Sequence, residues 1–342
     1  MSSRSMRNTH RTVDTPVLPP SSETADDALI ADAARHLNEQ RLVIFPSETV
    51  YGLGADARSD KAVLAIFEAK GRPRFNPLIV HVADLAAAQE IGVLDTRALA
   101  LSSAFWPGPL SLVVPKRTDS GLSDLVTAGL DSVALRVPAH PVAHKLLVMA
   151  GIPMAGPSAN ISETVSPTEP GHVAETFGDA VAARLYGGAT ECGLESTVVA
   201  VLPGEPLTLL RPGSVTRAQI EQVTGEKLGV AKSDKITSPG QMRRHYAPKA
   251  RLRLNAATAQ PGEVLIAFGA PPDGQRPFVN LSPEGDLHEA AAGLFAALRA
   301  LDEAGHTRAA IMPIIDDLSG PGSGLGEAIN DRLTRAATGD ET

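Results

Sequence analysis

Three cationic side chains lie close together in the loop from Lys70 to Arg74, where Lys70, Arg72 and Arg74 are interleaved with a glycine and a proline. Ammonium and guanidinium groups are the usual partners of phosphate oxygens. The loop leads into an apolar segment, Pro77 to Val82, with one polar residue, His81. The segment predicts a phosphate-holding site, and His81 belongs either to that site or to the core as a satisfied histidine.

A second polar segment runs from Phe45 to Gly54. An apolar strand, Leu42 to Phe45, is expected to enter a hydroxyl-rich turn and then Tyr51, followed by the turn glycines Gly52 and Gly54. Such a turn presents hydroxyl and backbone N–H groups at a strand end, where open α/β sheets place their sites. The alternative is an ordinary, capped strand-to-helix turn.

The segment Ser132 to Val137 carries an arginine inside an apolar strand. Period-two alternation puts Ser132, Ala134 and Arg136 on one face. Burying an unpaired arginine would cost several kcal/mol, so Arg136 needs a partner. Either an internal carboxylate or an anionic ligand must supply it.

Further polar turns could bind phosphate oxygens or a ribose. They are residues 155–162, 166–168, 193–198 and 210–214. The chain has no G-x-x-x-x-G-K-[ST] or G-x-G-x-x-G segment, so a nucleotide site must be built another way. The pair His140 and His144 lacks the glutamate of H-E-x-x-H and predicts no metal site, and Cys192 has no flanking base to activate it.

Strand and helix patterns alternate along the chain, which predicts an α/β fold. The expected organisation is a disordered segment over residues 1–27, a catalytic domain over 28–225, a basic linker or lid over 226–250, and a small α/β domain over 251–342. Length supports this division, because 342 residues with 43% hydrophobic content suffice for two cores.

Composition narrows the class of protein. The formal charge of -8 argues against broad, nonspecific nucleic-acid binding, although seven Lys/Arg and one acid fall between Lys232 and Arg253. No run of apolar residues reaches the roughly 18 needed to span a membrane. A single cysteine fits a reducing compartment, so we expect a cytoplasmic protein without a cysteine-based zinc site.

Taken together, these segments resemble the YrdC-like family of threonylcarbamoyl-adenylate synthases in its longer, two-domain form, from about Ala28 to Ala337. The matching segments, in order, are FPSETVYGLGADA, KGRPRFNPLIVHV, WPGPLSLVV, VALRVPAHP, PSANIS with SPT, GLESTVV, LLRPG, SPGQMRRHYAP and GLGEAINDRLTRAA. Ser47 stands where many relatives have threonine, and residues 241–244 depart from the family's linker pattern.

The resemblance implies a YrdC-like twisted open sheet with a basic cavity, followed by a smaller Rossmann-like domain. It also implies a reaction of L-threonine, bicarbonate and ATP that gives threonylcarbamoyl-AMP and pyrophosphate, with Mg²⁺ accompanying ATP. Partner proteins would then transfer the threonylcarbamoyl group to tRNA, next to the anticodon, so that tRNA is contacted at most indirectly.

Site residues follow from the same resemblance. Those implied for threonine are Thr49, His81, Arg136, Gly156 and Ser196. Those implied for ATP are Lys70, Arg72, Asn76, Ser132, Ser158, Asn160, Ser166, Arg211 and Tyr246. Lys70 and Arg72 are expected to be catalytic as well, the substrate carboxylate becomes the expected partner of Arg136, and His245 with Tyr246 is expected to form a lid.

Two other functions compete with this interpretation. One is a tRNA or double-stranded RNA binding module without catalysis, which the acidic charge and the 4% aromatic content disfavour. The other is carbamoyl transfer as in the YrdC-like part of hydrogenase maturation proteins, whose acylphosphatase-like and zinc-finger segments this chain lacks.

Overall fold

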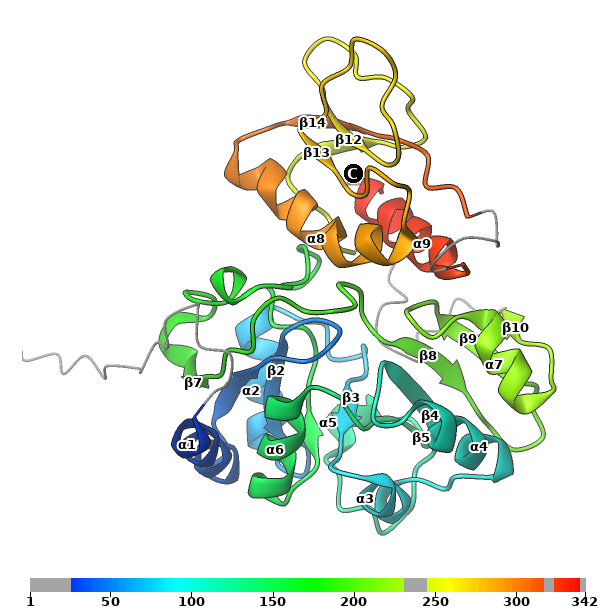
Figure 1. Ribbon diagram of the computed structural model, residues 1–342. Helices are drawn as coiled ribbons and strands as arrows, with labels where there is room; N and C mark the ends of the chain where they lie inside the picture. Colours follow the sequence, from blue (N-terminus) through cyan, green and yellow to red (C-terminus); the bar gives the residue numbers. More distant parts are fainter. Residues whose placement is uncertain (1–25, 231–244, 317–322, 339–342) are drawn as a thin grey trace, which may run out of the picture.

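The computed structural model describes residues 26–230, 245–316 and 323–338. It has two α/β parts, each with its own sheet, stacked one above the other (Figure 1). The mixed α/β class and the large twisted sheet predicted from the sequence are confirmed. Residues 1–25 of the expected disordered segment lie outside the described residues, whereas Asp27 already belongs to the first helix, which the Asp26 side chain caps.

The larger part contains the following elements in chain order: α1 (Asp27–Asn38), β1 (Leu42–Phe45), β2 (Gly52–Asp56), α2 (Asp60–Lys70), β3 (Ile79–His81), α3 (Leu85–Ile91), α4 (Thr96–Phe105), β4 (Leu110–Pro115), α5 (Asp124–Thr127), β5 (Ser132–Arg136), α6 (Pro141–Ala150), β6 (Met154–Ala155), β7 (Val181–Arg184), β8 (Thr197–Ala200), β9 (Thr208–Arg211), α7 (Arg217–Thr224) and β10 (Gly229–Val230). Two 3₁₀ turns, Pro170–His172 and Gly178–Ala180, precede β7.

These strands form one ten-stranded sheet in the order β10-β9-β8-β4-β5-β3-β6-β2-β1-β7. Strand β5 lies parallel to β3, with Arg136 opposite His81, and antiparallel to β4. Strand β3 in turn pairs antiparallel with the short β6, which ends just before Gly156. The central strands therefore bring the predicted polar residues of three separate segments to neighbouring positions.

The turn expected at Tyr51 to Gly54 is instead a buried strand, β2, antiparallel to β1. Its glycines are needed for close packing rather than for turning. A Cβ on Gly52 would lie 2.3 Å from the Phe45 ring, and a Cβ on Gly54 would lie 2.5 Å from the Met154 sulfur. The hydroxyl-rich turn is therefore shorter than expected and ends before β2 begins.

Helix α2 positions the cationic loop. Ser59 caps its N-terminus, and Gly71 ends it in the left-handed conformation at φ 61°. That conformation suits glycine because it lacks a Cβ. Lys70 is consequently held in the last helical turn, and Arg72 begins the loop.

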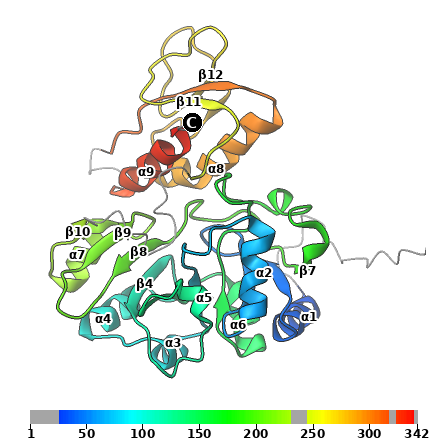
Figure 2. The same ribbon diagram turned by 180° about the vertical axis from the view of Figure 1, so that it is seen from behind.

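The smaller part contains β11 (Arg251–Arg253), β12 (Val264–Ala267), β13 (Val279–Asn280), α8 (Leu287–Glu303), β14 (Arg308–Ile311) and α9 (Leu325–Ala337). Its strands form a parallel sheet in the order β11-β14-β12-β13. Helices α8 and α9 lie between this sheet and the larger part, as the front and back views show (Figures 1 and 2).

The apolar core of the smaller part includes three side chains of the larger one, Val50, Val165 and Leu194. The two parts approach so closely that a Cβ on Gly193 would lie 2.4 Å from the Ala291 carbonyl oxygen of α8. The larger sheet also continues past Gly225 to Val230, through β10. Among the described residues, no helix is long and apolar enough to cross a bilayer.

Candidate functional site

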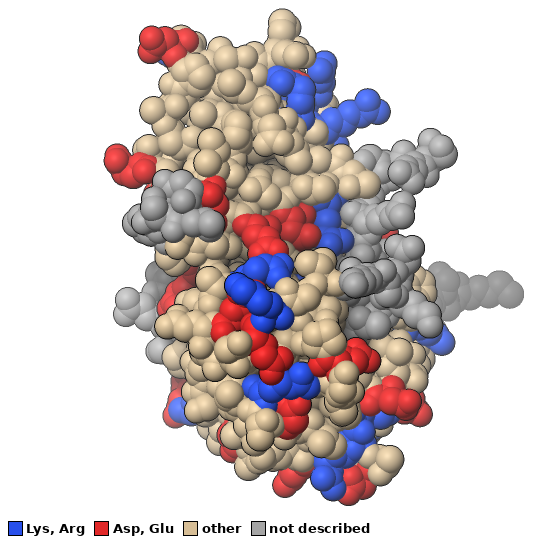
Figure 3. All heavy atoms as spheres, turned by 90° about the vertical axis from the view of Figure 1, so that its right-hand side faces the viewer, with Lys and Arg blue, Asp and Glu red and all other residues tan. Residues whose placement is uncertain are grey.

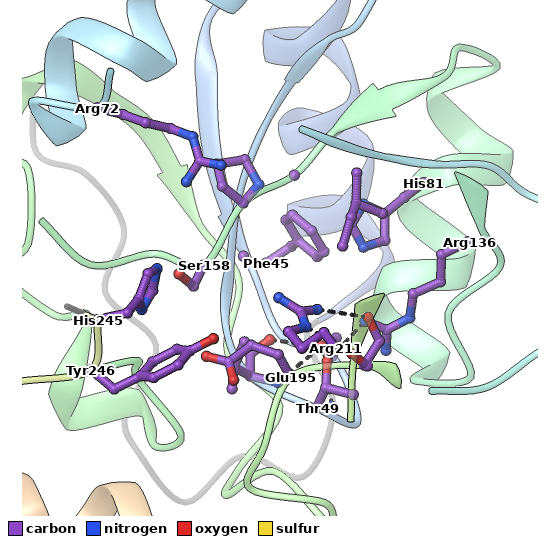
Figure 4. Close-up of a pocket in the computed structure, with 17 residues that line it drawn as sticks. Phe45, Thr49, Arg72, His81, Arg136, Ser158, Glu195, Arg211, His245 and Tyr246 are labelled. Atoms are coloured by element: carbon purple, nitrogen blue, oxygen red, sulfur yellow. Dashed lines mark hydrogen bonds between the residues drawn. The ribbon is translucent and has the colours of Figure 1, made fainter. Parts of the chain in front are cut away.

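A cavity opens on the larger part where β3, β5 and the segment after β6 meet the linker residues His245 and Tyr246 (Figure 4). It encloses about 560 Å³ of empty space, counting its open mouth. Its walls are Phe45, Ser47, Thr49, Val50, Gly52, Arg72, Ile79, His81, Arg136, Gly156, Pro157, Ser158, Glu195, Ser196, Arg211, His245 and Tyr246. Three arginines from distant parts of the sequence face this cavity, which suits it to an anionic ligand.

Arg136 lies at one end of the cavity and is held from three sides. Its Nη2 donates to Glu48 Oε1 at 2.6 Å, its Nη1 to Thr49 Oγ1 at 2.9 Å, and its Nε to the Gly108 carbonyl oxygen at 3.2 Å. The carboxylate that compensates the charge of Arg136 is therefore Glu48 of the chain itself, so a substrate carboxylate is not the missing partner that was expected but an additional one. Burial works to raise the pKa of Glu48, but the charge of Arg136, together with hydrogen bonds from Arg136 and from the backbone, lowers that pKa below its usual value.

His81 faces the same end of the cavity (Figure 4). Burial, together with the nearby charge of Arg136, lowers the pKa of His81 to about 3, so its imidazole is neutral at neutral pH. One ring nitrogen bonds to the Met154 backbone, while Nδ1 is buried with no hydrogen-bond partner among the described residues. A neutral ring with a bare Nδ1 is an acceptor, and it points at the space beside Gly156.

Ser196 and Arg211 form the next part of the wall. Arg211 Nε donates to the Ser196 carbonyl oxygen at 3.0 Å, and its Nη2 donates to Ser196 Oγ at 3.1 Å. Ser196 Oγ also lies 2.8 Å from Ser111 Oγ of β4. The two side chains thus face the cavity as one hydrogen-bonded unit that presents both a hydroxyl and a guanidinium group.

Lys70 and Arg72 lie at the opposite end, where a smaller pocket adjoins the cavity and shares Arg72, Ser158 and His245 with it. Lys70 Nζ donates to the Ser158 carbonyl oxygen at 2.6 Å and to that of Asn160. Arg72 is fixed by the carbonyl oxygens of Asn76 and Pro77. Burial lowers the pKa of Lys70 well below its usual value and that of Arg72 to about 10.

The linker residues His245 and Tyr246 close the cavity on the side of the smaller part. Tyr246 is fully buried, and its ring stacks on Phe295 of α8 with centroids 5.4 Å apart. An aromatic side chain therefore anchors this end of the linker to the core of the smaller part. Residues 231–244 of the expected linker or lid lie outside the described residues.

The structure brings twelve of the fourteen expected site residues to these two pockets. The exceptions are Ser132 and Ser166. Ser132 begins β5, four residues before Arg136, which at the rise of a strand puts it roughly 13 Å away. Ser166 is buried and donates its hydroxyl to Glu195 Oε1 at 2.5 Å, so its side chain turns to that carboxylate.

Two carboxylates of the site were missed in the sequence. Glu48 is the partner of Arg136, and the need for such a partner was the signal that pointed to it. Glu195 lines the cavity and sits in the polar turn before β8, but nothing in that turn distinguishes it from a solvated surface glutamate.

Neither described pocket offers a resident metal site. Within the described residues, no three His, Cys, Asp or Glu side chains are grouped so as to hold a metal ion. On the face shown in Figure 3, described Lys and Arg residues alternate with Asp and Glu instead of forming a broad positive field. The described residues of that face therefore form no extended electrostatic footprint for a nucleic-acid backbone.

Comparison with known proteins gives a family for both parts of the chain. A family model described as "Telomere recombination" matches residues 35–213, and one described as "Threonylcarbamoyl-AMP synthase, C-terminal domain" matches residues 215–338. A threonylcarbamoyl-AMP synthase of Bacillus subtilis is 40% identical over 337 residues, covering 92% of this chain and 95% of its own. One of Pyrococcus abyssi is 39% identical, covering 92% and 96%.

Comparison with solved structures gives the same family. The crystal structure of the Pyrococcus abyssi protein Sua5 complexed with L-threonine superimposes with a TM-score of 0.82 at 36% identity, covering 92% of this chain and 96% of that one. Both domains and nearly the whole length of the relatives are matched. This chain belongs to the threonylcarbamoyl-AMP synthase family.

Proposed function

We propose that this protein condenses L-threonine, bicarbonate and ATP into threonylcarbamoyl-AMP and pyrophosphate. The observation that carries the proposal is the cavity itself, in which Arg136 and His81 lie at one end and Arg72 and Lys70 at the other. A small zwitterion with a hydroxyl group fits the first end, and a polyphosphate fits the second. The complex of the Pyrococcus abyssi relative with L-threonine supports the same assignment.

Threonine is proposed to lie against Arg136. A guanidinium group has five N–H donors, and the described residues take three of them, so two can still meet a carboxylate. Thr49 and Ser196 add hydroxyl groups beside it. His81 Nδ1 can accept a hydrogen bond from the amine or the hydroxyl of threonine. Because Gly156 has no side chain, the space beside this nitrogen stays open for the ligand.

ATP is proposed to bind along Arg72, Ser158, Arg211 and Tyr246, with Lys70, Asn76 and Asn160 around its outer end. Asn160 also fixes the loop of this pocket, because its amide donates to the carbonyl oxygens of Ile161 and Thr164. For Ser132 and Ser166 the proposal requires a rearrangement, since neither lines the pockets.

Two chemical steps balance the reaction. The neutral amine of threonine attacks the carbon of bicarbonate, and water leaves to give a carbamate. A carbamate oxygen then attacks the α-phosphorus of ATP, and pyrophosphate leaves with the electrons of the broken P–O bond. His81 is a poor base at its low pKa, so we assign the rate gain to positioning and to the cations, which meet the charge that develops on the phosphates.

The described side chains do not fit a resident Mg²⁺ ion, and we propose that the metal enters with the phosphates of ATP. We further propose that the product passes to proteins that transfer the threonylcarbamoyl group to tRNA, and that this takes place in the cytoplasm.

Pyrophosphate release tests the proposal. We expect release from ATP only when both L-threonine and bicarbonate are present, and little with L-serine. Equal rates with threonine, with serine and without amino acid would contradict it. Tight tRNA binding without any pyrophosphate would instead favour the RNA-binding alternative.

A further inference from the structure

Arg332 belongs to α9 of the smaller part, yet its side chain is completely buried against the larger one. Its Nε donates to Glu195 Oε2 at 2.8 Å, and its Nη2 donates to the Pro212 carbonyl oxygen at 2.9 Å. Its Nη1 donates to the neighbouring Asp331 at 2.8 Å. A buried guanidinium is thus fixed between the turn before β8 and the turn after β9, both of which border the cavity.

Glu195 gives this contact its importance. Its carboxylate lines the cavity that is proposed to take a triphosphate, and its side chain is 7% exposed. An uncompensated buried carboxylate on that wall would repel the phosphates. Burial acts to raise the pKa of Glu195, but the charges of Arg332 and Arg211, together with hydrogen bonds from Ser166 and Arg332, lower that pKa below its usual value.

Arg211 is the group for which Glu195 and a phosphate would compete. It is proposed to bind ATP, and it is close enough to Glu195 to be attracted to its charge. In the structure its guanidinium bonds to Ser196 instead, while Glu195 bonds to Arg332 and Ser166. Because Arg332 pairs with the Glu195 carboxylate, the Arg211 guanidinium does not have to pair with it and can face a ligand in the cavity.

Arg332 also touches the linker. Its Cζ lies 5.2 Å from the centroid of the Tyr246 ring, the distance of a cation–π contact. Tyr246 lines the cavity and also stacks on Phe295. One side chain of the smaller part therefore contacts both the acidic wall and the aromatic wall of the cavity.

We propose that Arg332 is a positioning residue for ATP, which neutralises Glu195 so that Arg211 stays available to the phosphates. This proposal depends on the proposed function in one point only, namely that the anion bound near Arg211 is ATP. It assigns the smaller part a role in the reaction of the larger one, because the cation that completes the ATP end comes from α9.

The test compares four forms of the full-length protein: wild type, Arg332→Met, Glu195→Gln and the double variant. Methionine fills much of the space without charge, and glutamine keeps an acceptor for Ser166 without charge. Arg335→Met is the matched control, because Arg335 is on the same helix and bonds to the same Asp331. Calorimetry gives the affinity for ATP and for threonine, and thermal unfolding checks that each variant is folded.

We expect Arg332→Met to weaken ATP binding about tenfold or more, the effect of one lost charge-assisted interaction, and to change threonine binding much less. The double variant should recover most of the ATP affinity, because the competing carboxylate is gone. Glu195→Gln on its own is the reference for the double variant, and Arg335→Met should bind ATP about as well as the wild type. A merely structural role of Arg332 would leave the double variant as weak as Arg332→Met or weaker.

The proposal is overturned if Arg332→Met weakens ATP and threonine binding equally, or if Glu195→Gln in the same chain restores nothing. If Arg332→Met does not fold, Arg332→Lys replaces it: retained charge should hold ATP affinity near that of the wild type, and an equal loss for both ligands would contradict the proposal. Wild-type protein that binds no ATP would instead refute the proposed function.

Discussion

Glu48 Oε1 lies 2.6 Å from Arg136 Nη2 in a buried ion pair at the end of the cavity that is proposed to bind threonine. The pair joins the turn after β1 to the end of β5, and Thr49 Oγ1 takes a second N–H of the same guanidinium. The orientation of Arg136 is therefore set by the protein before any ligand arrives. Preorganised donors of this kind cost no rearrangement when the ligand binds.

Replacing Arg136 by alanine should reduce threonine affinity more than ATP affinity, by about tenfold or more for threonine, because a directional, charge-assisted contact is lost. Glu48 would be left buried without its cation, so stability should also fall, by about 3–5 kcal/mol. Titration of each ligand by calorimetry checks the first expectation, and urea unfolding checks the second. Unchanged threonine affinity would make Arg136 a purely structural partner of Glu48.

Adding one methyl group at Gly156 should block the end of the cavity that is proposed to bind threonine. A Cβ there would lie 2.8 Å from His81 Nδ1 and 3.0 Å from the Phe45 ring. Gly156→Ala should therefore raise the KM for threonine while ATP binding stays near that of the wild type. Gly293→Ala is the control, because a Cβ on this residue of α8 meets nothing within 4 Å and alanine favours a helix by about 1 kcal/mol.

Binding of ATP should be accompanied by proton uptake at alkaline pH. Burial and the neighbouring Arg72 lower the pKa of Lys70 in the free protein, and a phosphate nearby would raise it again. Calorimetric titration in buffers with different ionisation enthalpies measures the protons taken up. Lys70→Met should abolish the uptake and weaken ATP binding, whereas a titration without uptake in the wild type would mean that Lys70 does not meet the nucleotide.

Stability should fall below neutral pH in part because of His81. Its pKa is about 3 in the folded protein against an ordinary value of 6.5, so protons bind preferentially to the unfolded chain as the pH drops through 6.5. Between pH 7 and pH 5 this group alone should remove about 2 kcal/mol of the unfolding free energy. His81→Asn should lose correspondingly less over that interval in urea unfolding; an identical loss in both proteins would contradict the low pKa.

A chain truncated after Val230 should lose activity and aggregate more readily. Val50, Val165 and Leu194 would lose the core that covers them, and Glu195 would lose Arg332. We expect little pyrophosphate release and increased dye binding to exposed apolar surface. Full activity of the truncated chain would show that the smaller part is only attached to the larger one.

The sequence alone determined those features that depend on near neighbours. Period-two alternation placed Arg136 on a buried strand and required a partner for it, and the spacing of Lys70, Arg72 and Arg74 indicated a phosphate site. The final helix, Leu325–Ala337, likewise follows from local sequence, because its apolar residues recur at helical spacing. Resemblance to a family then added the roles of most cavity residues.

Only the tertiary structure decided which distant groups meet. Glu48 is 88 residues from Arg136, and Glu195 is 137 residues from Arg332, so no local pattern pairs them. Gly52 and Gly54 looked like turn residues, yet the Phe45 ring and Met154 require them in a strand. Contacts between segments far apart in the chain depend on the order of the strands in the sheet and on where α8 and α9 pack. The spacing of neighbouring residues does not determine either of these.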